Sequence, residues 1–309
     1  MGSLLQVTLC GTGERAAELA RGVFDAVAAD DALLTTWADE GPMITFNASA
    51  GRGLQAVSSG LWAALAAARD WSIRTGGRFD PTIGPVLDLW RHAADEGKMP
   101  ATEALSAARA RSGIDGLQLP ATGRAALARS GMRMDPGGFG KGWALDRASR
   151  ELPREAGVAW LLDFGGSSWL AHGTPPGASA WRVEIRREDG AVETLVELGN
   201  EALSVSGADG RFFEIDGQRF PHIVDPRTGR PVRRHRFSIV VAETAMAAEA
   251  WSTALVVAGP SEAAALLAEQ SAEGQVREAD GSVWASGRFR ASARRRDEVT
   301  HESPPALLR

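Results

Sequence analysis

The spacing of hydrophobic and polar positions changes along the chain and predicts an irregular alternation of helices and strands. Alternation at 3–10 predicts a first strand, and apolar residues three and four apart predict a helix at 13–29. A loop carrying Trp37 and Asn47 is predicted next, and glycine and proline make 77–90 irregular. The other predicted helices are 51–75, 101–112, 141–152, 245–258 and 260–271.

Strand patterns dominate from residue 158 to residue 242. The predicted strands are VAWLLDF, WRVEIR, VETLVEL, RFFEIDGQRFPHIV and FSIVVA. The pairs Asp216-Gly217 and Asp280-Gly281 predict hairpin turns, and a hairpin closes the pattern. We therefore predict an α+β fold, one compact unit with two lobes over 1–290. The polar, proline-containing segment 291–309 is predicted to be a disordered tail.

Composition excludes several classes of protein. A chain of 309 residues with 44% hydrophobic and 24% charged residues is typical of a globular protein with a substantial core. The net charge of −5 argues against binding of nucleic acid through a general positive field. No apolar run approaches the roughly 20 residues that a transmembrane helix needs. The single cysteine, Cys10, excludes an internal disulfide and a cysteine-rich metal site.

The first residues, MGSLLQVTLC, predict a strand rather than an export signal. Leu9-Cys10 is faintly similar to a lipoprotein cleavage site, but neither a basic region nor a long apolar region precedes it. We therefore expect a cytoplasmic protein. A periplasmic or lipid-anchored location is expected only if an upstream export segment has been removed.

The segment MDPGGFGKGWALD, residues 134–146, carries the first candidate chemistry. Asp135 opens a glycine-rich loop, and Lys141 stands where a predicted helix begins. Backbone N–H groups at such a helix start favour an anion, and the lysine adds a full positive charge. The pattern is neither a Walker loop nor a dinucleotide fingerprint. A tight turn that packs a helix on a sheet explains it equally well.

The segment PHIVDPRTGRPV, residues 221–232, carries a histidine and a carboxylate three positions apart. Both are predicted on a strand that leads into a proline turn, so both can reach the same end of the sheet. His222 suits a general base near neutral pH, and a structural role is an equal alternative. For Asp225 we favour a turn role, in which its side chain accepts from the backbone that follows.

The segment AMAAEAWSTALVV, residues 245–257, predicts a buried helix with one carboxylate. Glu249 and Thr253 are four positions apart and share a face, and Ser252 precedes Thr253. A buried carboxylate is costly unless it is paired or binds a metal ion. Carboxylate and hydroxyl oxygens suit Mg²⁺. From this helix alone, pairing with an arginine at the helix edge is the favoured alternative.

Together these segments resemble one known family. The order GRFDPTIGPVLDLW, MDPGGFGKGWALD, LLDFGGSSWLAHG, ALSVSG, HIVDPRTGRP and AEAWSTAL strongly resembles the ApbE family of FAD:protein FMN transferases. The resemblance runs from Met1 to about Gly287, and the opening MGS resembles the MGT at which the family's catalytic domain begins. It implies an ApbE-like (T-fold-like) catalytic unit in which mixed and antiparallel sheets are flanked by helices.

The resemblance implies a reaction and a set of residues. Members bind FAD and Mg²⁺ and transfer FMN to a threonine or serine hydroxyl of an acceptor flavoprotein, releasing AMP, and some hydrolyse FAD to FMN and AMP instead. His222 matches the histidine that activates the acceptor hydroxyl. The positions that match FAD contacts are Met1, Trp37, Arg78, Phe79, Asp80, Asp135, Lys141 and Ile223. Those that match metal contacts are Gly138, through its carbonyl, and Glu249, Ser252 and Thr253.

Two positions depart from the family pattern. Glu249 stands where the family has aspartate, so a bound Mg²⁺ would lie about 1 Å further from the helix. Pro136 stands where the family has an aliphatic residue, and it restricts Asp135 to an extended conformation. Three functions remain as hypotheses: an FMN transferase, an FAD pyrophosphatase in which water attacks, and a flavin-binding protein with weak or no catalysis.

Overall fold

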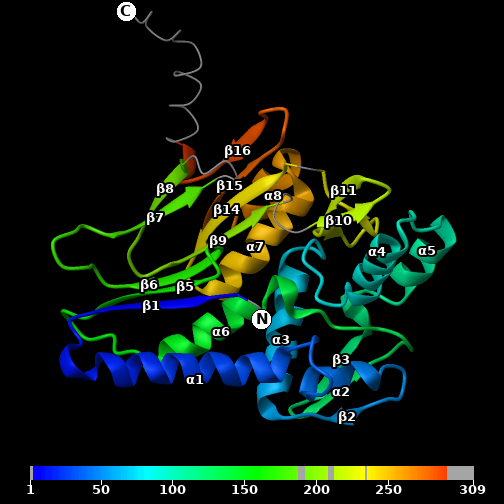
Figure 1. Ribbon diagram of the computed structural model, residues 1–309, viewed down its shortest axis with the longest axis horizontal. Coiled ribbons are helices and arrows are strands. Elements are labelled where there is room, and N and C mark those ends of the chain that lie inside the picture. The colour runs from blue at the N-terminus through cyan, green and yellow to red at the C-terminus, as the bar shows by residue number, and fades with distance from the viewer. Residues whose placement is uncertain (1–2, 187–191, 208–211, 234, 291–309) are drawn as a thin grey trace, which may run out of the picture.

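A seven-stranded antiparallel sheet lies at the centre of the part of the chain that the structure describes (Figure 1). The computed structural model describes residues 3–186, 192–207, 212–233 and 235–290, so Met1 and the predicted tail 291–309 lie outside the described residues. The strands, in spatial order, are β1 (Leu5–Cys10), β5 (Ala159–Phe164), β6 (Ser168–His172), β9 (Ala202–Gly207), β14 (Phe237–Ala242), β15 (Ala272–Arg277) and β16 (Val283–Ala285).

Helices cover one face of this sheet and a two-stranded ribbon covers the other. The helices are α7 (Ala245–Ala258) on β9 and β14, α6 (Gly140–Ala148) on α7, α1 (Ala16–Leu34) on α6, and α8 (Pro260–Leu267) on β15. The ribbon consists of β7 (Trp181–Arg186) and β8 (Val192–Leu198). Its alternate residues Trp181, Val183 and Ile185 are buried against the sheet, as expected for a strand with one wet face.

A second lobe lies beside the sheet (Figure 1). It contains α2 (Pro42–Ala48), α3 (Ser59–Arg74), α4 (Gly84–Glu96), α5 (Thr102–Ala110) and a small sheet of β2 (Gln55–Ala56), β4 (Arg124–Leu127) and β3 (Leu117–Ala121). Two ribbons, β10 (Phe212–Ile215) with β11 (Gln218–Pro221) and β12 (Val224–Asp225) with β13 (Arg230–Pro231), adjoin it. Short 3-10 turns are η1 (Gly13–Arg15), η2 (Ile114–Gly116), η3 (Pro136–Gly138) and η4 (Ser149–Glu151). The α+β prediction is confirmed, and no helix among the described residues is long and apolar enough to cross a membrane.

Several predicted elements lie where the sequence placed them. The helix predicted at 245–258 is α7, and it is buried along nearly all of its length. The Asp216-Gly217 turn joins β10 to β11, and both residues have positive φ values, 50° and 70°. Such values match the turn that the right-handed twist of a hairpin requires.

The prediction of irregular structure at 77–90 is wrong in its second half, where α4 begins at Gly84. Pro85 lies in the first turn, where a missing N–H removes no helical hydrogen bond. The helix ends at Gly97 with a φ of 64°. The glycine and proline of this segment therefore mark the start of a helix rather than a loop.

Other predictions of element bounds also need correction. Asn47 was predicted in a loop and lies in α2. The helix predicted at 51–75 begins only at Ser59, because the Ser58 side chain caps it by accepting from the Leu61 N–H at 3.2 Å. The predicted strands omitted β2, β3, β4, β6, β9 and β13. His222 and Asp225 were expected on one strand that leads into a proline turn at the end of the sheet. Instead, His222 lies between the β10–β11 and β12–β13 ribbons, which are separate from the main sheet.

The crossing of α6 and α7 depends on Gly142. A Cβ at this position would lie 2.6 Å from the backbone oxygen of Ala245, closer than real contacts allow. Because backbone atoms cannot move aside cheaply, Gly142→Ala is expected to lower the free energy of unfolding by about 1–3 kcal/mol in chemical denaturation. Gly199→Ala is the control, because a Cβ at Gly199 meets nothing within 4 Å. Equal stability of the two variants would contradict this account of the crossing.

Candidate active site

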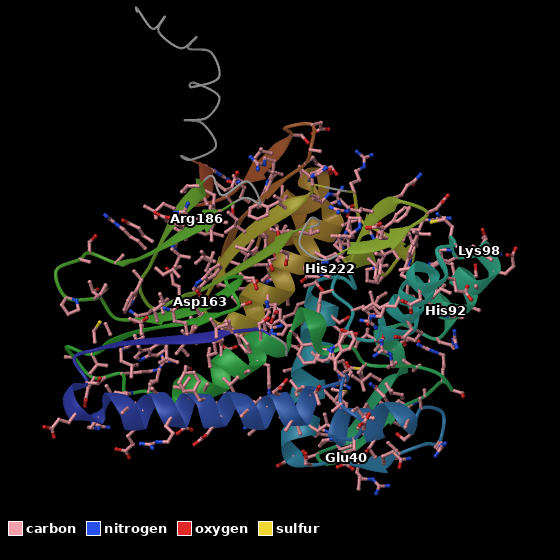
Figure 2. All side chains as sticks on the ribbon, viewed as in Figure 1. Glu40, His92, Lys98, Asp163, Arg186 and His222 are labelled. Atoms are coloured by element: carbon pink, nitrogen blue, oxygen red, sulfur yellow. The ribbon has the colours of Figure 1, made fainter. Side chains whose placement is uncertain are left out.

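A cavity of about 1000 Å³ lies where the two lobes meet the loop that precedes α6. This volume is in the range of sites that hold large organic ligands. In Figure 2 the labelled His222 lies near the middle of the molecule, between α7 and α4. The predicted site residues that line the cavity are Arg78, Phe79, Asp80, Gly138, Lys141, His222, Ile223, Glu249 and Thr253. Sequence segments that are far apart in the chain therefore converge on one space.

Asp135 and Pro136 set the conformation of the start of the glycine-rich loop. Asp135 has an extended backbone, as Pro136 requires of it, and its side chain accepts from the Gly137 N–H at 2.9 Å. The Asp135 N–H donates to the Pro81 oxygen at 2.7 Å, which ties the loop to the 78–83 segment. A Cβ at Gly138 would lie 3.2 Å from the Phe79 ring. The turn brings the loop backbone to the cavity wall.

Lys141 is held in place by two partners. Its Nζ donates to the Ser167 hydroxyl at 2.5 Å and lies 3.9 Å from the Glu249 carboxylate. Ser167 follows a turn in which Asp163 accepts from the Gly166 N–H at 2.8 Å, and Figure 2 labels Asp163. The positive charge therefore stands at the cavity in a fixed position, as anion binding requires.

Glu249 is a buried carboxylate that faces the same cavity from α7. Only 6% of its side chain is exposed, and it accepts from the Gly142 N–H at 2.6 Å. Burial raises the pKa of Glu249, whereas Lys141 and the Gly142 hydrogen bond act in the opposite direction. The arginine partner that was favoured from the helix alone is wrong, because the cation beside Glu249 is Lys141.

The oxygen-bearing residues near Glu249 form only a partial set of metal ligands. No group of three or more His, Cys, Asp or Glu side chains within the described residues could hold a metal ion. Of the residues predicted to contact a metal, Glu249, Thr253 and Gly138 line the cavity, and a Cβ at Gly138 would lie 3.7 Å from the Thr253 hydroxyl oxygen. This hard, incomplete set fits Mg²⁺, which commonly keeps phosphate and water as its other ligands.

Ser252 lies behind the cavity wall rather than on it. Its side chain is fully buried, and its hydroxyl is 3.0 Å from that of Ser204 and 2.8 Å from that of Ser206. It also donates to the Glu249 backbone oxygen at 3.0 Å. Ser204 and Ser206 themselves line the cavity. Ser252 thus reaches the site through these two serines, which the sequence reasoning missed.

Asp225 has the turn role that was favoured for it. Its carboxylate accepts from the Arg227 N–H at 2.9 Å and pairs with the Arg227 guanidinium at 3.1 Å. His222 and Ile223, by contrast, line the cavity. The structure thereby separates the two polar residues of this segment, because His222 lines the cavity and the Asp225 side chain is engaged in the turn.

The 78–80 segment supplies charges of both signs. Arg78 pairs with Glu262 through its Nε, at 3.1 Å, and through one Nη. Asp80 accepts from the Thr82 N–H at 2.8 Å and from its hydroxyl at 2.7 Å. Burial raises the pKa of Asp80. Both side chains line the cavity.

Two residues predicted to contact FAD do not line the cavity. Trp37 is 74% exposed, and the Arg91 guanidinium lies over its ring at 5.0 Å from the centroid. Arg91 also pairs with Asp135 at 3.3 Å. Trp37 and Asp135 are thus connected through Arg91 at the outer side of the loop. Their contact with FAD stays a prediction.

Asp146 caps α7, which carries Glu249, and provides a test by pH. Its carboxylate accepts from the Ala245 and Met246 N–H groups at 2.7 and 2.9 Å, and burial raises its pKa to about 6 from 3.8. Between about pH 4 and pH 6 the folded protein keeps a proton that the unfolded chain has released. The stability from this group is therefore present at low pH and lost as pH rises to about 6.

As pH rises from about 4 to about 6 in EDTA, the titration of Asp146 is expected to lower the free energy of unfolding by up to about 3 kcal/mol. Asp146→Asn should remove that part of the pH slope, because the amide does not titrate. Asp25→Asn, an exposed change on α1, is the control and should keep the wild-type slope. An identical slope in Asp146→Asn and wild type would overturn the assignment.

The sequence matches a known family over most of the chain. A family model described as the ApbE family matches residues 1–276. The chain belongs to the ApbE family. The FAD:protein FMN transferase of Klebsiella pneumoniae is 31% identical over 303 residues, which cover 94% of this chain and 86% of that protein. That of Salmonella typhimurium is 31% identical and covers 85% of this chain and 78% of its own length.

Solved structures agree on the ApbE fold. The apo flavinyl transferase ApbE of Pseudomonas stutzeri is 27% identical with a TM-score of 0.78, covering 94% of this chain and 96% of that one. The ApbE protein of Thermotoga maritima has a TM-score of 0.85 at 23% identity, with the same coverage, and shows the fold alone.

Among the residues that sequence reasoning missed, Ser167 carried a signal, because it follows the Gly165-Gly166 pair of a segment that resembles the family.

Proposed function

We propose that this ApbE-family protein is a Mg²⁺-dependent FAD:protein FMN transferase. The observation that carries the proposal is the convergence of Lys141, Glu249 and His222 on one cavity of about 1000 Å³. In the reaction, the acceptor hydroxyl oxygen bonds to the phosphorus of the FMN half of FAD. The bond from that phosphorus to the bridging oxygen breaks, and AMP leaves with the bridging oxygen.

Each of the three residues has a role that follows from its position. Lys141, fixed by Ser167, binds the anionic pyrophosphate and balances the charge that develops on the leaving phosphate. Glu249, Thr253 and the Gly138 carbonyl would hold Mg²⁺, which neutralises phosphate charge when bound. His222 takes the proton of the threonine or serine hydroxyl, which is a poor nucleophile until it is deprotonated.

One assay separates this proposal from the two alternatives. The protein is incubated with FAD, Mg²⁺ and a panel of candidate acceptor proteins, each with and without its threonine or serine hydroxyl. Fluorescent flavin that stays on the acceptor in a denaturing gel, together with AMP, supports the transferase. FMN and AMP without labelled acceptor would identify a pyrophosphatase, and unchanged FAD would identify a binding protein. An EDTA arm measures the dependence on the metal.

A further inference from the structure

Four charged side chains form a continuous series of ion pairs that begins at the cavity with Arg78 and continues behind its wall. Glu262, in the first turn of α8, is the shared member. Its carboxylate pairs with Arg78 on one side and, at 3.2 Å, with Arg227 on the other. Arg227 in turn pairs with Asp225 at 3.1 Å. The series joins the segment after α3, the start of α8 and the turn between β12 and β13, so three segments depend on one carboxylate.

Glu262 contacts only part of the Arg78 guanidinium. The Nε and one Nη donate to Glu262, and a guanidinium has five N–H groups in a fixed plane. Arg78 lines the cavity, and 20% of its side chain is exposed. Arg78 therefore keeps N–H donors that Glu262 does not use, on a side chain that lines the cavity. Because a long side chain otherwise loses rotamer freedom on binding, a held arginine binds an anion at lower entropic cost.

The ion pair of Glu262 with Arg227 connects α8 to the turn that carries part of the cavity lining. Arg227 lies in a turn that is closed by the Gly229 N–H, which donates to the Asp225 oxygen at 2.7 Å. Pro226 of this turn lines the cavity, as do the preceding residues 222–224. The hydrogen bonds from Arg78 hold the pKa of Glu262 below its usual range, so the carboxylate stays charged at neutral pH.

We propose that Glu262 is a positioning residue for the dinucleotide: it holds Arg78 toward the phosphates and keeps the Asp225–Gly229 turn against the cavity. Glu262 itself does not line the cavity, so it acts through Arg78 and Arg227. The inference rests on the proposed function for the identity of the ligand. Its test uses FAD binding, which is measured separately from transfer.

The main test is Glu262→Gln, which keeps the shape of the side chain and removes its charge. The Kd for FAD in EDTA, measured by flavin fluorescence, should rise about 10-fold, the loss expected for charge-assisted hydrogen bonds. The KM for FAD should rise with it, and kcat at saturating FAD should stay within about two-fold of wild type. Glu262→Asp, which keeps the charge, should recover part of the affinity. Glu269→Gln, an exposed change just after α8, is the control and should match wild type.

A double-mutant comparison shows whether Glu262 acts through Arg78. In an Arg78→Gln background, Glu262→Gln should change the Kd for FAD by clearly less than 10-fold, because only its contact with Arg227 is then left to lose. The same 10-fold loss in both backgrounds would overturn the proposal. So would a Glu262→Gln variant that binds FAD like wild type, or one that loses kcat alone. A wild type that binds FAD without transferring FMN would refute the proposed function and leave this binding test intact.

Discussion

Glu249→Gln is expected to reduce Mg²⁺-dependent AMP release from FAD on the order of 100- to 1000-fold, a loss typical of removing one electrostatic contribution to a transition state. The amide keeps the size of the side chain, and its oxygen can still accept from the Gly142 N–H. It loses the negative charge that a cation needs among the oxygen donors around Gly138 and Thr253. AMP release is measured by chromatography at several Mg²⁺ concentrations.

Two variants sharpen this prediction. Glu249→Asp restores the residue that the family resemblance places here, so its activity should equal or exceed that of wild type. Glu243→Gln makes the same chemical change at an exposed position just before α7 and should leave AMP release unchanged. AMP release that persists in EDTA would end the metal hypothesis. Full activity of Glu249→Gln in Mg²⁺ would assign the ligand to another residue.

His222→Asn is expected to slow FMN transfer by about 10²- to 10⁴-fold, the usual contribution of a general base. The amide occupies a similar volume and keeps polar atoms at the cavity, but it cannot accept a proton from the acceptor hydroxyl. The affinity for FAD should therefore stay near that of wild type. Transfer is followed by covalent flavin fluorescence on the acceptor, and FAD affinity by titration of the same protein.

The control for this variant is His92→Asn, an exposed histidine on α4 that pairs with Glu96 at 3.2 Å. It should transfer FMN at the wild-type rate. A His222→Asn protein that loses FAD affinity as much as it loses transfer would make His222 a binding residue. Loss of the folded state on the same substitution would assign it a structural role. Only a loss confined to transfer supports the role of base.

The sequence alone determined those features that depend on local pattern. The apolar run around Glu249 predicted α7 with its observed bounds, because 14 consecutive residues exceed the usual length of a strand and suit a buried helix. Asp216-Gly217 determined its hairpin for a similarly local reason, since both residues tolerate positive φ. The turn role of Asp225 also followed from the neighbouring proline.

Local pattern predicted the structure less well where the same residue type is compatible with two different elements. Gly84 and Pro85 interrupt a helix as readily as they begin one, and only packing of α4 in the second lobe decided between the two. Strands such as β6 and β9 lie in the middle of the sheet. Helices α6 and α7 cover one of their faces and the β7–β8 ribbon covers the other, so these strands lack the alternation of a strand with one wet face.

The partners of the charged groups were decided by the tertiary structure. Lys141 and Glu249 come together because α6 crosses α7 at Gly142, where the missing side chain permits close approach. Helical spacing predicted that Glu249 needs a partner, yet it does not specify which cation reaches it. Likewise, Arg78 and Glu262 meet only because α8 packs on β15, beside the segment that follows α3. The sequence shows which charged residues are present. Which of them pair depends on the distances between their side chains, and those distances are determined by how the helices pack.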